Sequence, residues 1–160
     1  MSGASARLES INLSRGGVPK TSVFEALVTE SGVDGDRQAD LRYHGGPDRA
    51  VVLYSLEVIE ALQHEGHPIH VGSTGENLTI SGVPWQDIVP GVELQIGGVR
   101  LRITTYAAPC SNIRGSFLDG DFTRIAQKIH PGWSRVCARV VSGGVVRPGD
   151  RVEIVSVDGR

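Results

Sequence analysis

At 160 residues, 39% of them hydrophobic, the chain is long enough to bury a core without help from disulfide bonds. Its formal net charge of −2 excludes the broad positive field of a protein that binds nucleic acid or a membrane surface. The apolar runs are too short to span a bilayer, and the opening "MSGASARLES" lacks the apolar segment of a secretory signal, which predicts a cytoplasmic protein.

Short β-forming runs occupy the first third of the chain. Residues 6–14 ("ARLESINLS") and 22–30 ("SVFEALVTE") each predict a strand. Residues 50–55 ("AVVLYS") form a continuous apolar run, which is typical of a strand that is buried on both faces.

A change of hydrophobic period predicts a helix over residues 55–66 ("SLEVIEALQHEG"). Ser55 can cap this helix, Ile59 and Leu62 fall on one face, and Gly66 can end it. The following "HEGHPIH" spaces three histidines as a metal site might require, but its glycine and proline break any helix that would align them. We interpret this stretch as a solvated loop.

The β pattern returns in the second half of the chain. Residues 75–81 ("GENLTIS") predict a strand, and residues 91–106 ("GVELQIGGVRLRITTY") alternate strictly on both sides of Gly97-Gly98, which predicts a hairpin. Residues 121–130 ("DFTRIAQKIH") predict a second helix, and residues 133–157 predict two final strands.

This element order indicates a mainly β protein with a few helices, of the α+β class. About eight short strands favour a mixed or antiparallel β-barrel, closed or nearly closed, with the two helices flanking or plugging it. No linker or long repeat divides the chain, so a single domain over residues 1–160 is expected.

Cys110 is the first candidate for chemistry. It stands in "TTYAAPCSNIRGS", in a loop just past a predicted strand end, where functional side chains are often presented. If "SNIRG" forms a helical turn, its N–H groups and Arg114 would favour the thiolate, which is both a nucleophile and a soft metal ligand. The alternative is a small buried hydrophobic residue.

Cys137 lies inside the predicted strand "SRVCARVV", on one face with Arg135 and Arg139. We interpret it as an ordinary strand residue. With only two cysteines and no Cys-x-x-Cys pair, a disulfide scaffold, a zinc ribbon and a thioredoxin-type motif are all excluded.

The glycine-rich segment "GDRQADLRYHGGPDRAV" (residues 35–51) is the second candidate. Its glycines would let backbone N–H groups approach an anion, and Arg49 would add charge. It is neither a Walker loop nor a dinucleotide-binding fingerprint. Physics alone leaves an anion cradle and a polar turn equally favoured, and His44 could also activate Cys110 for hydrolysis.

Together these segments resemble the MOSC domain family, named for the C-terminal domain of molybdenum cofactor sulfurase, and especially its small bacterial members. The resemblance rests on "GDRQADLRYHGGPDRAV", "GENLTI", Pro109-Cys110 and "GWSRVCARVVSGGVVRPGD", in that order, and covers residues 32–157. It implies a β-barrel that binds the molybdenum cofactor, with Cys110 as molybdenum ligand and catalytic residue. It also implies cofactor contacts from His44, Gly45, Gly46, Arg49, Asn77, Arg135 and Arg139.

The resemblance implies an oxidoreductase that reduces N-hydroxylated compounds. Besides the anionic pterin cofactor, its partners would be an external flavin or iron–sulfur electron donor and a second copy in a homodimer. The external donor is needed because one cysteine beyond Cys110 cannot hold a cluster. Pyridoxal phosphate binding is also associated with the family. The alternatives are a sulfur carrier or cofactor-handling module with a persulfide on Cys110, and a binding module in which Cys110 is structural.

Overall fold

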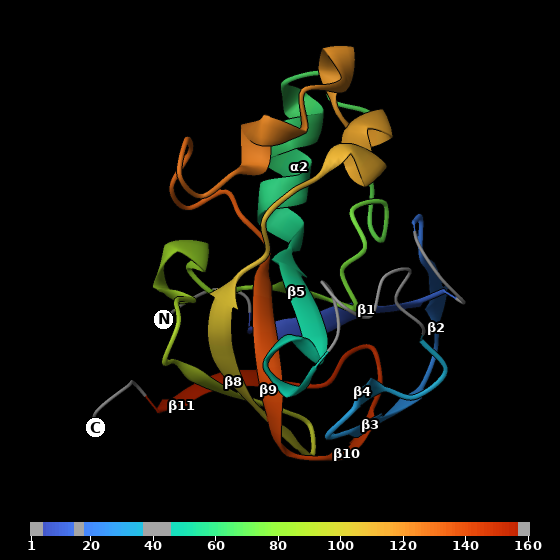
Figure 1. Ribbon diagram of the computed structural model, residues 1–160. Coiled ribbons are helices and arrows are strands. Elements are labelled where there is room, and N and C mark those ends of the chain that lie inside the picture. The colour runs from blue at the N-terminus through green and yellow to red at the C-terminus, as the bar shows by residue number, and fades with distance from the viewer. Residues whose placement is uncertain (1–4, 15–17, 37–45, 157–160) are drawn as a thin grey trace.

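The computed structural model describes residues 5–14, 18–36 and 46–156. In these ranges the chain is mainly β with few helices, as expected (Figure 1). The larger sheet has the order β11-β7-β8-β9-β5-β6-β1-β2, and the smaller one has the order β10-β3-β4. The strands are β1 (Arg7–Leu13), β2 (Thr21–Val23), β3 (Ala26–Thr29), β4 (Gly32–Val33), β5 (Val51–Ser55), β6 (Leu78–Ser81), β7 (Glu93–Ile96), β8 (Val99–Tyr106), β9 (Val136–Ser142), β10 (Gly144–Val146) and β11 (Val152–Ser156).

A closed barrel is not confirmed. All neighbours in the larger sheet are antiparallel except β5 and β6, which run parallel, so the sheet is mixed. Arg7 of β1 and Arg151 form an isolated bridge, and backbone hydrogen bonds join Leu8 to Gly149 and Asp150 and Ala6 to Val152, but no ladder links β1 and β11. The other half of β1, at Ile11–Leu13, pairs with β2.

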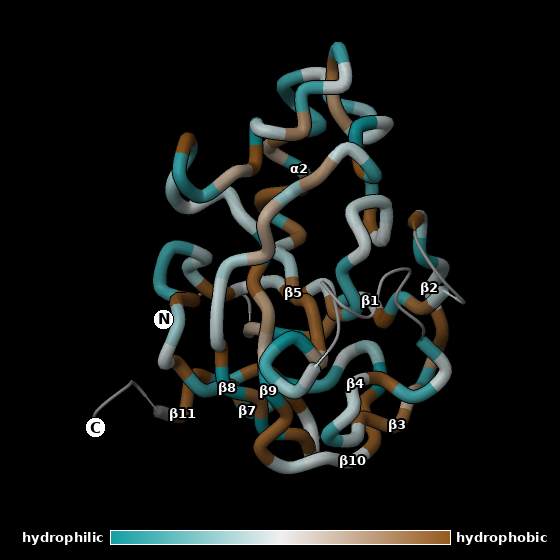
Figure 2. Tube along the Cα trace, in the orientation of Figure 1, coloured by the Kyte–Doolittle hydropathy of each residue, from teal (hydrophilic) through white to brown (hydrophobic). Residues whose placement is uncertain are grey.

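The predicted strand at residues 50–55 is the central β5, which pairs with β6 on one side and β9 on the other. Val51, Leu53 and Tyr54 are fully buried, as the continuous apolar run indicated. Figure 2 shows hydrophobic stretches running through β5, β9 and the smaller sheet, which together enclose the core. The hairpin prediction is also confirmed, since β7 and β8 pair with Ile96 opposite Val99.

Three predicted elements differ in the structure. The predicted strand at residues 22–30 is split into β2 and β3, which belong to different sheets, and Phe24 between them is 91% exposed. The predicted helix at 121–130 is only a 3-10 turn, because Ala126 is extended and Ile129 finds no core to cover it. The C-terminal region holds three strands, β9 to β11, where two were expected.

Among the described residues the one α-helix is α2 (Leu56–His64), which stands beyond one end of the larger sheet (Figure 1). Short 3-10 helices connect the other elements: η1 (Pro47–Arg49), η2 (Trp85–Asp87), η3 (Ser111–Ser116), η4 (Leu118–Gly120) and η5 (Phe122–Ile125). No helix in the described part of the chain is long and apolar enough to cross a membrane.

The N-cap of α2 gives a first stability prediction. The Ser55 hydroxyl accepts a hydrogen bond from the Val58 N–H at 3.1 Å and satisfies a donor that the helix leaves unpaired. Ser55→Ala should lower the free energy of unfolding by about 1 kcal/mol, measured by urea denaturation. Ser142→Ala, at an exposed position of β9, is the control, and an equal loss there would contradict the capping role.

Candidate functional site

A cavity of about 340 Å³ opens where five separate segments of the chain meet. It lies beside the end of β8 and the start of β9, with Val52 of β5 also in its wall. The lining residues are Val18, Lys20, Arg49, Val52, Thr74, Gly75, Asn77, Tyr106, Ala107, Ala108, Pro109, Cys110, Asn112, Ile113, Arg135 and Cys137.

The structure brings together four of the predicted site residues: Arg49, Asn77, Cys110 and Arg135 all line this cavity. Arg139 does not. Its guanidinium is half exposed and pairs with Asp48 at 3.2 Å on the surface. Gly46 directly precedes η1 with a φ of 93°, a conformation that favours glycine, and does not line the cavity. His44 and Gly45 lie outside the described residues.

Cys110 is presented where the sequence predicted, in the loop beyond the end of β8. It directly precedes η3, so "SNIRG" does form a helical turn, and the Ile113 N–H bonds to the Cys110 carbonyl at 3.1 Å. The thiol is free and partly accessible. The loop is tied down on one side by the Ala107 N–H, which donates to the Arg135 carbonyl at 3.0 Å.

Arg135 carries a buried positive charge into the cavity wall. The residue is 8% exposed, and burial lowers the pKa of Arg135 while Tyr54 and Glu76 oppose that shift. Its Nη1 donates to the Thr74 carbonyl at 2.7 Å and its Nη2 to the Ala107 carbonyl at 3.3 Å, whereas its Nε has no partner. Within the described ranges no carboxylate pairs with it. A buried charge left in this state favours an anionic ligand.

Glu76 fixes the position of Arg135 indirectly, through Thr74. This carboxylate is fully buried and accepts hydrogen bonds from the Gly72 N–H at 2.9 Å, the Thr74 hydroxyl at 2.8 Å and the Thr79 hydroxyl at 3.3 Å. Because Thr74 is fixed by Glu76 and its carbonyl accepts from Arg135, the guanidinium is positioned through Thr74.

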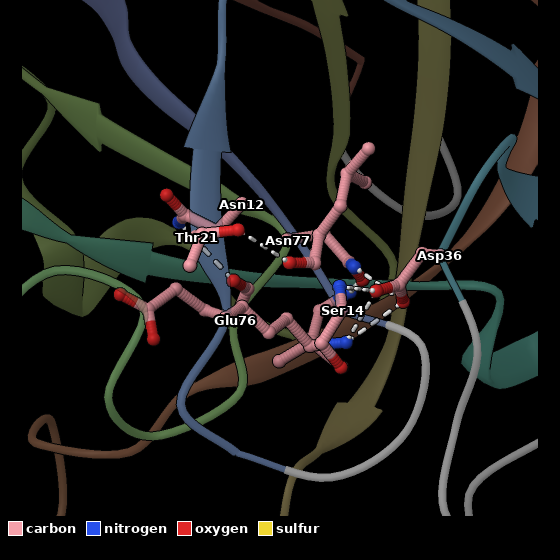
Figure 3. Close-up of polar contacts among 9 residues, drawn as sticks. Asn12, Ser14, Thr21, Asp36, Glu76 and Asn77 are labelled. Atoms are coloured by element: carbon pink, nitrogen blue, oxygen red, sulfur yellow. Dashed lines mark hydrogen bonds and ion pairs between the residues drawn. The ribbon is translucent and has the colours of Figure 1, made fainter.

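Lys20 and Asn77 meet at one carboxylate, that of Asp36, and Figure 3 shows Asn77 and Ser14 beside it. Lys20 Nζ lies 2.7 and 2.8 Å from its two oxygens, Asn77 Nδ2 donates at 2.9 Å, and the Ser14 N–H donates at 2.9 Å. Asn77 Oδ1 accepts from the Val52 N–H. The amide of Asn77 is therefore largely committed to the cavity wall, and the charge of Lys20 is neutralised by Asp36.

Arg49 reaches the cavity from η1, which is anchored to the sheet. The Thr104 hydroxyl donates to the carbonyls of Asp48 and Cys137. Burial raises the pKa of the Cys137 thiol, and the nearby charges of Arg135 and Arg49 oppose that shift. The cavity is thus positive on the side where the two cysteines lie.

Cys137 was predicted to be an ordinary strand residue, and it is buried in β9 at 4% exposure, yet it lines the cavity. Its shared face with Arg135 was the one sequence signal that could have placed it there. Lys20 and Thr74 carried no such signal, because they come to the cavity from distant segments. Tyr106 lies in the segment of Cys110, but its strand pattern did not show that it would face a cavity.

The two thiols should differ in reactivity. At pH 8 we expect iodoacetamide to alkylate Cys110 at least about tenfold faster than Cys137. Cys110 is partly accessible, whereas Cys137 is buried and burial raises the pKa of its thiol, which lowers its thiolate fraction. Mass spectrometry of digested protein measures both rates. Equal rates would show that Cys137 is as accessible as Cys110.

In the described part of the chain, no group of three or more potential metal ligands gathers, in the histidine stretch or elsewhere. His67 is nevertheless not solvated. Its Nδ1 accepts from the Leu118 N–H at 3.0 Å and its Nε2 lies 3.2 Å from Glu65, which also binds Arg124. These contacts join the end of α2 to the segment that follows Cys110.

Comparison with known proteins gives a family and a fold. The family model described as "MOSC domain" matches residues 40–153. "Uncharacterized protein YflK" of Bacillus subtilis is 27% identical over 164 residues, spanning 92% of this chain and 72% of that protein. "Protein YiiM" of Escherichia coli is 27% identical over 137 residues, spanning 82% of this chain and 60% of that protein.

Among solved structures, the crystal structure of YiiM from Geobacillus stearothermophilus superimposes with a TM-score of 0.74 at 23% identity, over 94% of this chain and 75% of that one. The crystal structure of YiiM from Escherichia coli gives a TM-score of 0.67 at 22% identity. At these identities the likeness concerns the fold.

Proposed function

The chain belongs to the MOSC domain family, and from this premise we propose that its cavity binds a molybdenum cofactor and that the protein is an oxidoreductase. One observation carries the proposal: an accessible cysteine thiol shares a cavity with a buried guanidinium whose Nε has no hydrogen-bond partner among the described residues.

The cavity suits such a cofactor in three respects. Cys110 offers a soft thiolate ligand. Arg135 and Arg49 offer charge for a phosphate, and the partnerless Nε of Arg135 is a donor that such an anion would satisfy. The volume of about 340 Å³ falls at the lower end of the range for cavities that hold small molecules.

Each residue has a distinct task under this proposal. A bound molybdenum would supply oxygen-atom and electron transfer. Cys110 would hold the metal, and Arg135, fixed through Thr74, would orient the anionic end of the cofactor. Burial of the guanidinium strengthens that attraction, because little water competes for it. The electrons come from a separate redox partner, and the substrates are N-hydroxylated compounds.

Metal analysis of protein purified from a molybdenum-replete host tests the proposal. We expect about one molybdenum atom per chain, because one accessible thiolate would hold one metal. We also expect the protein to reduce an N-hydroxylated compound when an artificial electron donor is supplied. Folded protein without molybdenum would contradict the proposal. If intact mass then shows one extra sulfur atom that disappears in Cys110→Ser, the protein is a sulfur carrier instead.

A further inference from the structure

A second cavity, of about 220 Å³, lies next to the first. We propose that it binds an uncharged, planar ring. The inference rests on the proposed function for one point only, that the ring is the body of the substrate. The lining residues are Trp85, Gln86, Ile88, Val89, Tyr106, Gln127, Pro131, Gly132 and Ser134.

The two cavities differ in charge. The first contains Lys20, Arg49 and Arg135, whereas no charged side chain lines the second. A charged group would lose its hydration in the second cavity and find no counter-ion among these residues. The occupant is therefore neutral, and its volume is that of one ring or two fused rings rather than of a whole cofactor.

The walls are flat and fixed. Trp85 is 7% exposed, its Nε1 donates to the Ser134 carbonyl at 2.8 Å, and its ring packs edge-on against Tyr54 with centroids 6.1 Å apart. Tyr106 supplies a second aromatic wall and Pro131 a rigid one. A preorganised aromatic slot favours a planar ring over a bulkier saturated one.

Three polar side chains at this cavity have hydrogen-bonding groups without a partner among the described residues. Gln127 Oε1 accepts from the Gly132 N–H at 3.1 Å, which leaves its Nε2 without a partner among the described residues. The Tyr106 hydroxyl and the Gln86 amide likewise make no hydrogen bond within those residues. A ring that bears an amide or a ring nitrogen would satisfy these donors.

Tyr106 lines both cavities, which therefore adjoin at this residue. A ring in the second cavity would lie one side chain away from the cavity of Cys110. Under the proposed function, the N-hydroxyl group attached to that ring would point past Tyr106 toward Cys110. Tyr106 and Trp85 would then determine substrate specificity.

Binding of benzamide to the cofactor-free protein, followed by ¹H–¹⁵N NMR, tests the proposal. The chain has two tryptophans, so the indole signal of Trp85 is assigned with Trp85→Phe. We expect benzamide to shift this signal and the Gln127 side-chain amide, with a Kd of about 1 mM, as befits a single ring. Benzoate and cyclohexanecarboxamide should bind at least about tenfold more weakly because of charge and shape.

Two variants separate cavity binding from other effects. Val89→Phe fills the cavity and should weaken benzamide at least about tenfold, whereas Val83→Phe, a partly buried position outside both cavities, should leave the affinity unchanged. Tyr106→Phe should weaken benzamide several-fold by removing one hydrogen bond.

Each outcome decides a different point. If the wild-type protein shows no benzamide shifts, or if Val83→Phe weakens binding as much as Val89→Phe, the second cavity is not the ring site, whatever the metal content. If benzamide binds as described but the protein never holds molybdenum, the ring site stands and the proposed function fails.

Discussion

Replacing Cys110 by serine should lower molybdenum occupancy by more than about 100-fold, because loss of an outer partner of a metal ligand alone costs 10–100-fold. A serine hydroxyl stays protonated at neutral pH and is a poor ligand for a soft metal site. The thiol is free and accessible in the loop that precedes η3. Metal content and reductase activity of the two purified proteins measure the effect, with circular dichroism confirming that both are folded.

The same substitution at Cys137 identifies the ligand. Both thiols line the cavity, but Cys137 is buried and burial raises its pKa, so it is a weak donor at neutral pH. Cys137→Ser should therefore keep most of the metal. If Cys137→Ser loses molybdenum and Cys110→Ser keeps it, the assignment of the ligand is wrong.

Replacing Arg135 by methionine should separate stability from binding. The guanidinium is buried without a carboxylate partner in the described ranges, and replacing buried ionic groups by apolar ones is often neutral or stabilising. The loss of its bonds to the Thr74 and Ala107 carbonyls offsets that gain, so the free energy of unfolding should change by less than about 1 kcal/mol. Molybdenum occupancy should fall at least about tenfold, the value of one charge-assisted hydrogen bond.

Arg139→Met, four residues further along the chain and within β9, is the matched control. Arg139 is half exposed and pairs with Asp48 at the surface, where an ion pair contributes about 0–1 kcal/mol. Arg139→Met should therefore alter neither the molybdenum occupancy nor the free energy of unfolding appreciably. Urea denaturation and metal analysis of both variants check the prediction. A loss of 3 kcal/mol or more in Arg135→Met, about the cost of breaking a buried charge network, would mean that Arg135 serves the fold rather than a ligand.

Much of the fold could be predicted because it depends on neighbours in the sequence. The hairpin of β7 and β8, the buried β5 and the helix capped by Ser55 each follow from local periodicity, turn residues or a cap. The prediction of a helix at 121–130 was wrong because it, too, relied on the local pattern alone. Its apolar spacing was helical, but Ile129 meets no partner in the tertiary structure and stays 58% exposed.

The candidate site could be predicted only in part. The position of Cys110 beyond a strand end was visible in the alternating pattern of residues 99–106. Tyr106 ends that strand, yet nothing in the pattern indicated that it would face a cavity, and for Cys137 in β9 the one signal was its shared face with Arg135. That depended on segments 18–20 and 74–77, which come from elsewhere in the chain.

The sequence by itself determined the mainly β class, the main strands, the capped helix and membership of the MOSC domain family, since hydrophobic period, capping residues and motif order are local properties of the chain. Only the tertiary structure distinguished Arg135 from Arg139. Strand period predicts that both share one face. In the structure Arg135 directly precedes β9 and donates to the carbonyls of Thr74 and Ala107, whereas Arg139 lies within β9 and is half exposed to solvent. Burial depends on contacts between distant segments, and burial is what makes the charge of Arg135 available to a ligand.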